Sequence, residues 1–287
     1  MIVCPTVRKQ DIRSHYNLTT LFYRLLWGRH IHHGLWSGDE KATVAQQRLT
    51  ETLAREAGIL PSDRVLDVGC GMGSSSIYLA SQLGCEVTGI TISSVQRRWA
   101  QCAARWHNVA RRTQFLFADA EQVVFAPRSY DVVWSIECTE HLFDKPQFFR
   151  RVADWLRPGG RVAICAWLDG NRGDADATQQ VHRVCEGFFC PSLGAAEEYQ
   201  QWIENAGLVR LRYHDWTSAV IRTWEICQER VCRTGVRWLA RAIDQNSVLF
   251  LDRFDAILEA YRTGVMRYGC FVAERPHLEM SEHVNGA

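Results

Sequence analysis

The most informative segment of the chain is Val65-Leu66-Asp67-Val68-Gly69-Cys70-Gly71-Met72-Gly73-Ser74. A short apolar strand over Arg64–Val68 runs directly into three glycines at alternate positions, and a helix is predicted over residues 74–83. Glycine adopts positive φ readily and lets a ligand approach the backbone closely, while the first turn of a helix offers unpaired N–H groups. The segment therefore predicts a ligand-binding turn between a buried strand and a helix.

Strand and helix patterns alternate on both sides of this turn. The predicted strands are 64–68, 86–90, 113–118, 131–135 and 160–167, and the predicted helices are 74–83, 94–106, with Ser93 or Ser94 as cap, and 147–156. Such alternation predicts a parallel sheet with helices on both faces. The run 162–167 lacks polar alternation, as expected for a strand buried on both sides. The fold class is therefore α/β.

The flanking segments are predicted to be mainly helical. Helices near 18–27 and 42–57 form an N-terminal segment over 12–58, ahead of a core at 60–168. A polar turn at 169–176, helices at 178–188 and 197–206, a strand at 208–215, helical sequence over 218–263 and a last strand at 267–273 follow. We expect a single domain over 1–287 in which residues 169–265 form a helical cap around a late strand, with a frayed tail at 276–287.

Composition excludes several classes of protein. The chain has 287 residues, 47% of them hydrophobic and 23% charged, as in ordinary globular proteins. A net charge of +1 provides no field for nucleic-acid binding. No run of about 18 apolar residues predicts a transmembrane segment, and Pro5 with three charges before any apolar run argues against a signal peptide. Eleven cysteines without a C-x-x-C pair indicate reduced thiols packed as small hydrophobes, hence a cytoplasmic protein.

The glycine turn differs from a dinucleotide site in two respects. Its third glycine comes one residue earlier than in G-x-G-x-x-G, and Asp67 precedes the first glycine. A carboxylate there would repel a pyrophosphate but would suit an ammonium group. S-adenosylmethionine carries an ammonium and a sulfonium and no phosphate. The alternative is a structural turn that binds no ligand.

The run D-V-G-C-G-M-G over 67–73 resembles the first motif of class I S-adenosylmethionine-dependent methyltransferases. Further segments resemble the γ-tocopherol methyltransferase branch, which is related to the sterol and cyclopropane-fatty-acid methyltransferases: 27–34, 89–93 with Gln96, 133–141, 156–160 and 261–265. The resemblance covers nearly the whole chain. It implies a Rossmann-like seven-stranded sheet with helices on both faces, an N-terminal helical lid and a late helical cap.

The same resemblance implies S-adenosylmethionine as cofactor, with S-adenosylhomocysteine as product. The residues that it places around the cofactor are Tyr16 of the lid, with Trp27 beside it; Asp67, Gly69, Cys70 and Gly71 at the methionine end; Thr91, Ile92 and Gln96 near the ribose; Asp119 and Ala120 near the adenine; and Ser135 and Ile136 at the end of the fourth strand. Thr91 stands where many methyltransferases have an acid. Simpler interpretations remain open: a turn cap for Asp67, an N-cap and a surface glutamine for Thr91 and Gln96, and a loop aspartate for Asp119.

Glu140 and His141 are the candidate general acid and base groups. Methylating an aromatic carbon requires loss of a proton, and histidine titrates near neutrality unless its environment shifts it. A carboxylate can accept a phenol proton or stabilise a cationic intermediate. The alternative is a pair that only stiffens its loop. His30, His32 and His33 do not have helical metal-ligand spacing, so no metal is expected.

Six aromatic residues crowd the late region and have two interpretations, as core or as the lining of an apolar acceptor pocket that faces the sulfonium. They are Trp202, Trp216, Trp224, Trp238, Phe250 and Phe254.

The expected function is methylation of a small, apolar acceptor that bears a hydroxylated aromatic ring or a prenyl chain, as in tocopherol. Carbon is the first choice of acceptor atom, and nitrogen and oxygen remain open. Two other classes are alternatives: a non-catalytic S-adenosylmethionine sensor, and a nucleotide-dependent oxidoreductase. The oxidoreductase predicts an acid at the end of the second strand, where Thr91 stands. The sequence leaves monomer and homodimer equally open.

Overall fold

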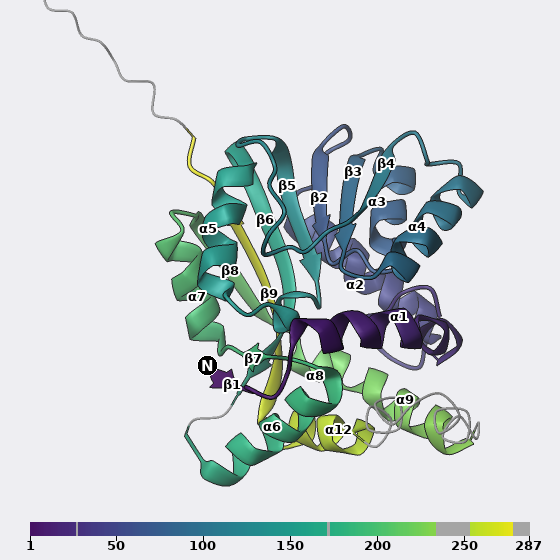
Figure 1. Cartoon of the computed structure of the whole chain (residues 1–287), viewed down its shortest axis with the longest axis vertical. Coiled ribbons are helices and arrows are strands. Elements are labelled where there is room, and N and C mark those ends of the chain that lie inside the picture. Colours follow the sequence, from purple (N-terminus) through teal and green to yellow (C-terminus); the bar gives the residue numbers. More distant parts are fainter. Residues whose placement is uncertain (27, 171–172, 234–252, 278–287) are drawn as a thin grey trace, which may run out of the picture.

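A seven-stranded sheet organises the computed structural model, which describes residues 1–26, 28–170, 173–233 and 253–277 (Figure 1). The strands are β2 (Arg64–Val68), β3 (Glu86–Thr91), β4 (Thr113–Phe117), β5 (Tyr130–Ile136), β6 (Leu156–Asp169), β8 (Val209–Asp215) and β9 (Met266–Glu274). Their order is β4-β3-β2-β5-β6-β9-β8. Strands β2 to β6 are parallel, and β9 lies antiparallel between β6 and β8. The expected seven-stranded α/β fold is confirmed.

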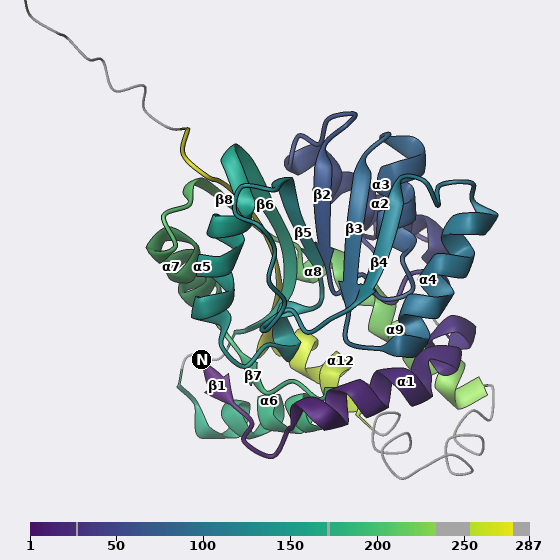
Figure 2. The ribbon, with the colours of Figure 1, turned by 45° about the horizontal axis from the view of Figure 1, so that its top comes forward.

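Helices cover both faces of the sheet (Figures 1 and 2). One face carries α2 (Ala42–Glu56), α3 (Ser74–Gln82) and α4 (Ser94–Trp106), and the other carries α5 (Lys145–Trp155) and α7 (Ala196–Asn205). Successive side chains of a strand point to opposite faces. Val65 accordingly packs in the buried cluster that contains Leu49 of α2, and Leu66 packs in the one that contains Phe148 of α5.

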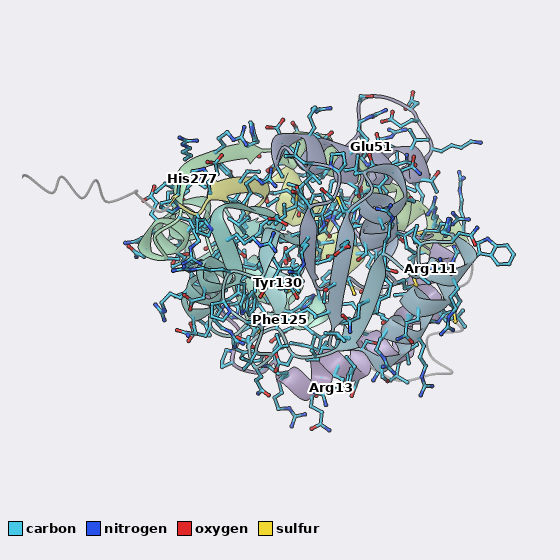
Figure 3. All side chains as sticks on the ribbon, turned by 90° about the horizontal axis from the view of Figure 1, so that it is seen from above. Arg13, Glu51, Arg111, Phe125, Tyr130 and His277 are labelled. Atoms are coloured by element: carbon cyan, nitrogen blue, oxygen red, sulfur yellow. The ribbon has the colours of Figure 1, made fainter. Side chains whose placement is uncertain are left out.

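Local signals set several element boundaries. The Ser93 hydroxyl accepts a hydrogen bond from the backbone N–H of Gln96 at 3.1 Å, so Ser93 is the N-cap of α4. Asp144 caps α5 in the same way. On the α5 face, the rings of Phe125 and Tyr130 meet edge to face with centroids 5.4 Å apart. Figure 3 shows these rings inside the fold, whereas Arg13 projects from its edge.

The carboxyl ends of the parallel strands are covered by a separate helical layer (Figure 1). It comprises α1 (Lys9–Leu26), α6 (Ala175–Phe188), α8 (Thr217–Val220), α9 (Arg222–Arg233) and α12 (Phe254–Arg262). A two-residue strand β1 (Ile2–Val3) pairs with β7 (Ser192–Leu193) and attaches the N-terminus to this layer. The short helix η1 (Thr139–His141) follows β5. Within the described ranges, no helix is long and apolar enough to cross a bilayer.

Three features differ from the sequence prediction. Helix α1 begins at Lys9 instead of near residue 18. Burial of Ile12 in the core stabilises this first part of the helix, although its sequence is mainly polar. Strand β6 begins at Leu156 instead of residue 160, because Gly159 and Gly160 form backbone hydrogen bonds with Arg275. The β1–β7 pair was not predicted.

Some predicted features lie outside the described residues. They are Trp27, Trp238, Phe250, residues 171–172 of the predicted turn, the 234–252 part of the late helical region and the 278–287 part of the tail.

Candidate functional site

The glycine turn after β2 has the backbone that its sequence demands. Gly69, Gly71 and Gly73 all have positive φ, between +53° and +83°. A Cβ on Gly69 would lie 2.4 Å from the Cys138 side chain, and one on Gly73 would lie 2.8 Å from Ala100, so these two glycines permit close packing. At Gly71 the nearest atom would be Ile31 Cδ1, 4.0 Å away. The backbone at Gly71 therefore faces open space that a ligand can occupy.

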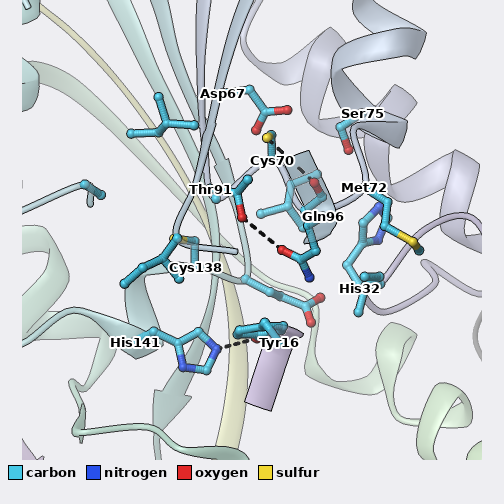
Figure 4. A pocket seen from close by; sticks show the side chains of 18 of the residues that line it. Tyr16, His32, Asp67, Cys70, Met72, Ser75, Thr91, Gln96, Cys138 and His141 are labelled. Carbon is cyan, nitrogen blue, oxygen red and sulfur yellow. Dashed lines mark hydrogen bonds between the residues drawn. The ribbon is translucent and has the colours of Figure 1, made fainter. Parts of the chain in front are cut away.

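This open space is a pocket of about 1000 Å³ beneath α1, at the carboxyl ends of β2, β3 and β5 (Figure 4). It lies where the strand order reverses, which is where open α/β sheets bind ligands. The residues that were assigned to the cofactor and line it are Tyr16, Asp67, Gly69, Cys70, Gly71, Thr91, Ile92, Gln96, Asp119, Ala120 and Ile136. Ser135 is outside this lining: it is fully buried, and its hydroxyl donates to the Val68 carbonyl at 3.0 Å.

Asp67 places a carboxyl group in the wall of the pocket. Its side chain is buried and accepts a hydrogen bond from the Ser76 hydroxyl at 2.5 Å. Burial raises the pKa of Asp67 to about 7, and the bond from Ser76 offsets this only in part. An ammonium group would stabilise the ionised form, so this carboxyl group fits the amino-acid end of S-adenosylmethionine.

Thr91 and Gln96 form a neutral polar pair at the end of β3. The Thr91 hydroxyl donates to Gln96 Oε1 at 2.9 Å, which fixes the amide beside the pocket (Figure 4). Amide and hydroxyl groups can both hydrogen-bond a ribose diol. The pair can therefore bind the ribose of a nucleoside, although neither residue is the acid that a dinucleotide site has at this position.

Lys9 of α1 reaches across the pocket to two acids in the loop after β4. Its ammonium lies 2.8 Å from Asp119 Oδ2 and 2.6 Å from Glu121 Oε2. The ion pairs join the N-terminal lid to the segment that was assigned to the adenine. Lys9 was not predicted as a site residue. Its sequence neighbours Arg8, Gln10 and Asp11 are also polar, so the local sequence does not distinguish it from a surface residue.

A second, smaller cavity adjoins the first. The two cavities share Tyr16, Ile31, Glu137 and His141, and the remaining lining of the second is Tyr23, His33, Glu140, Trp167, Phe188, Cys190 and Trp224. Of the late aromatic residues, Trp224 lines this cavity. Phe254 packs behind it against Phe188, and Trp202 packs against Phe149 on the far face of the sheet. Phe254 and Trp202 therefore belong to the core, whereas the interpretation of Trp224 as lining of an acceptor pocket stays a prediction.

Glu140 lines the second cavity, and one of its carboxyl oxygens has no hydrogen-bond partner among the described residues. One carboxyl oxygen accepts the backbone N–H of Trp167, whereas Oε2 has no hydrogen-bond partner in the described chain. The residue is 2% exposed. Burial raises the pKa of Glu140 to about 8, more than the bond from Trp167 lowers it. Glu140 is therefore mainly protonated at neutral pH, unlike an ordinary carboxylate.

His141 is paired with Tyr16 at the junction of the cavities. Its Nδ1 donates to the Phe189 carbonyl at 3.0 Å, so Nε2 is free of hydrogen and accepts from the Tyr16 hydroxyl at 2.7 Å (Figure 4). Burial lowers the pKa of His141 to about 4. His141 is thus a neutral acceptor, and its pKa does not lie near neutrality as the sequence suggested, because the imidazolium would be desolvated.

Glu137 is a central residue that the sequence analysis did not select. Its backbone has a φ of +52°. Its carboxylate accepts hydrogen bonds from the His33 amide (2.8 Å), the Tyr268 hydroxyl (2.8 Å) and the Trp167 indole (3.1 Å), and His33 Nδ1 lies 2.9 Å away. Burial alone would raise the pKa of Glu137, but the attraction of His33 and its hydrogen bonds lower it to about 2. Glu137 is therefore ionised.

The histidines of the N-terminal segment have separate partners. His30 and His32 contact each other at 3.1 Å, and His33 faces Glu137. Throughout the described part of the chain, no group of three or more His, Cys, Asp or Glu side chains is arranged to hold a metal ion.

Comparisons with known proteins agree with this architecture. The family described as mycolic acid cyclopropane synthetase matches residues 5–269. Tocopherol O-methyltransferase of Arabidopsis thaliana is 30% identical over 292 positions, covering 93% of this chain and 82% of the relative. The 27-O-demethylrifamycin SV methyltransferase of Amycolatopsis mediterranei is 35% identical over 258 positions, covering 88% and 92%.

Among solved structures, the cyclopropane synthase MmaA2 from Mycobacterium tuberculosis has the same fold. It superposes with a TM-score of 0.83 over 94% of this chain and 99% of that one, at 19% identity. The match to nearly the whole chain, together with a pocket that fits the cofactor, identifies the family. The chain belongs to the mycolic acid cyclopropane synthetase family and is a class I S-adenosylmethionine-dependent methyltransferase of the branch that includes the tocopherol methyltransferases.

Proposed function

We propose that the protein C-methylates a small hydroxylated aromatic acceptor with a largely apolar body, of the tocopherol type. The observation that carries this proposal is the second cavity, which adjoins the cofactor pocket and is lined by Glu140, whose carboxyl group has one oxygen without a partner among the described residues. When bound, S-adenosylmethionine supplies an activated methyl group. The protein has to orient the acceptor, exclude water and accept the protons that the acceptor loses.

The lining of the second cavity suits an apolar ring. Phe188, Trp167 and Trp224 meet edge to face, with ring centroids between 5.2 and 5.8 Å apart. These residues present aromatic carbon to the cavity. An acceptor with an apolar body would gain about 25 cal/mol for each Å² that it buries here.

Glu140 is the proposed acceptor of the hydroxyl proton. Oε1 already accepts the Trp167 backbone N–H, so Oε2, which has no partner among the described residues, is the oxygen left to accept a proton. A pKa of about 8 makes its ionised form a much stronger base than an ordinary carboxylate, and general bases act best when their pKa lies near the working pH. The deprotonated phenol is the more nucleophilic form, at oxygen and at the adjacent ring carbons.

The Tyr16–His141 pair provides a second proton route. When the new carbon–methyl bond has formed, the hydrogen on the same ring carbon must leave as a proton. The Tyr16 oxygen can receive it while the Tyr16 proton moves to His141 Nε2, 2.7 Å away. The low pKa of His141 then returns the proton to solvent. Two proton acceptors match a reaction at carbon: the hydroxyl proton moves to Glu140 and returns to the acceptor oxygen when the ring aromatises, and the ring proton is the one that leaves.

O-methylation is the second candidate. The names of two relatives, tocopherol O-methyltransferase and 27-O-demethylrifamycin SV methyltransferase, favour it. Methyl transfer to a phenol oxygen requires only one proton acceptor, which Glu140 can provide. The Tyr16–His141 pair would then only orient the acceptor.

One experiment separates these reactions. The purified protein is incubated with ¹³C-methyl-labelled S-adenosylmethionine and prenylated phenols and hydroquinones that have an open ring position, and the products are examined by NMR. A label on a ring carbon supports the proposal, and a label on oxygen supports the second candidate. Transfer only to amines, with every hydroxylated aromatic unchanged, would overturn both. Boiled protein and the Glu140→Gln variant are the controls.

A further inference from the structure

Glu137 holds a negative charge at the boundary between the two cavities. It follows the last residue of β5, it lines both cavities, and its side chain is only 9% exposed. Its backbone has a positive φ, and its carboxylate accepts hydrogen bonds from His33 of the N-terminal segment and from Tyr268 of β9. The residue is therefore placed where the methyl group must pass from donor to acceptor.

Every donor to this carboxylate is electrically neutral. The Tyr268 hydroxyl, the Trp167 indole and the His33 amide are neutral by nature. The ring of His33 is neutral as well, because the Trp224 indole donates to its Nε2 at 2.5 Å. An indole N–H can only donate, so Nε2 carries no hydrogen and Nδ1 carries the proton that faces Glu137.

The charge of Glu137 is consequently solvated by hydrogen bonds but not neutralised. Among the residues that the structure describes, no lysine or arginine is a hydrogen-bond or ion-pair partner of Glu137. A buried ion without a counter-ion is costly. The hydrogen bonds from the Tyr268 hydroxyl, the Trp167 indole and the His33 amide solvate the carboxylate without adding a positive charge. A cationic ligand group beside it would gain the remaining attraction.

Other carboxyl groups of the pocket cannot provide the same discrimination. Asp119 and Glu121 are paired with Lys9. Asp67 suits an ammonium group, which the methyl donor and its demethylated product have in common. Only the sulfonium charge distinguishes the donor from the product, and it disappears when the methyl group leaves.

We propose that Glu137 is the counter-charge for the sulfonium of the methyl donor, and that it makes the site prefer the cationic donor over the neutral product. Glu137 is in this view a specificity residue, and its charge also promotes product release. The inference rests on the methyl transfer proposed above, because it requires donor and acceptor to meet between the two cavities.

Calorimetric binding measurements test the proposal without turnover. Sinefungin carries an ammonium group near the position of the sulfonium, and S-adenosylhomocysteine is neutral there. At pH 7 the wild type should bind sinefungin at least tenfold more tightly than S-adenosylhomocysteine, which corresponds to about 1.4 kcal/mol. In Glu137→Gln this ratio should fall about tenfold, because the variant keeps the size of the side chain and removes its charge.

Two matched variants control for structure. Glu140→Gln alters a carboxyl group of the same cavity that is protonated at neutral pH, so it should leave the ratio unchanged. Glu137→Asp keeps the charge and disturbs the hydrogen bonds, so it should weaken both ligands and preserve most of the ratio. Thermal melting verifies that each variant is folded.

Equal affinities of the wild type for the two ligands would overturn the inference, whether or not Glu137→Gln folds. An unchanged ratio in a folded Glu137→Gln would overturn it as well. Neither result would touch the proposed acceptor chemistry, which the labelling experiment tests separately.

Discussion

Asp67 should release a proton when the cofactor binds. Burial holds the pKa of this carboxyl group at about 7 in the free protein, so about nine-tenths of the molecules carry the proton at pH 6. An ammonium group beside Asp67 favours the ionised form. Binding at pH 6 should therefore release about 0.9 proton from this residue, and Asp67→Asn should release none from this position.

The same shift predicts the stability of the free protein. The pKa of Asp67 rises from 3.8 to about 7 on folding, which corresponds to up to about 4 kcal/mol. Since the folded protein holds this proton more tightly than the unfolded chain, its contribution is fully present below pH 4. It is lost as the pH rises from about 4 to 7. Asp67→Asn should lack this loss, so the free variant should be more stable than the wild type at pH 8.

The assay is calorimetric titration with S-adenosylhomocysteine at pH 6 in buffers of different ionisation enthalpy, whose slope gives the number of protons released. The variant should also bind at least about tenfold more weakly, because one charge-assisted contact is gone. Comparison at one pH cancels the titration of the ligand. Equal slopes for wild type and variant, or an unchanged dissociation constant, would refute the assignment of Asp67 to the ammonium group.

Three further substitutions test the rest of the site. Glu140→Gln should lower turnover about 100-fold or more. It should also abolish the rise of kcat/KM with pH that the wild type should show up to about pH 8, and it should leave the affinity for S-adenosylhomocysteine within about twofold. Full steady-state activity would remove Glu140 from the mechanism. Tyr16→Phe removes the hydroxyl that donates to His141 and should slow turnover about tenfold or more without changing the melting temperature by more than a few degrees; unchanged turnover would exclude the second proton route. Lys9→Met should speed dissociation of S-adenosylhomocysteine by up to about fivefold in stopped-flow experiments, because partly exposed ion pairs contribute about 0.2–1 kcal/mol. Added salt should reproduce the effect in the wild type. Equal dissociation rates of variant and wild type would show that the ion pairs do not retain the ligand.

The sequence was sufficient for the core because the signals there are local. Buried parallel strands are short apolar runs, and the glycine turn requires its own backbone conformation. The predicted helix at 94–106 therefore matches α4, and the strand at 64–68 matches β2. The extent of α1 was wrong because the burial of Ile12 is a tertiary effect that propensity does not register.

The site was predictable only in part, for the same physical reason. Eleven of the twelve residues assigned to the cofactor line the pocket, and all of these except Tyr16 of α1 lie near the carboxyl end of a strand whose position the sequence reveals. Glu137 was missed because its partners His33 and Tyr268 are 104 and 131 positions away along the chain. The charge states of Glu140 and His141 could not be read from the sequence either, since burial sets them.

Helix α1 unites two tasks that many enzymes assign to different elements. It closes the cofactor pocket through Lys9, and it carries the Tyr16 hydroxyl that completes the hydrogen bond to His141. Any movement of α1 that lets a ligand exchange must also separate Tyr16 from His141. The proton-transfer path proposed for Tyr16 and His141 is therefore complete only while α1 covers the pocket.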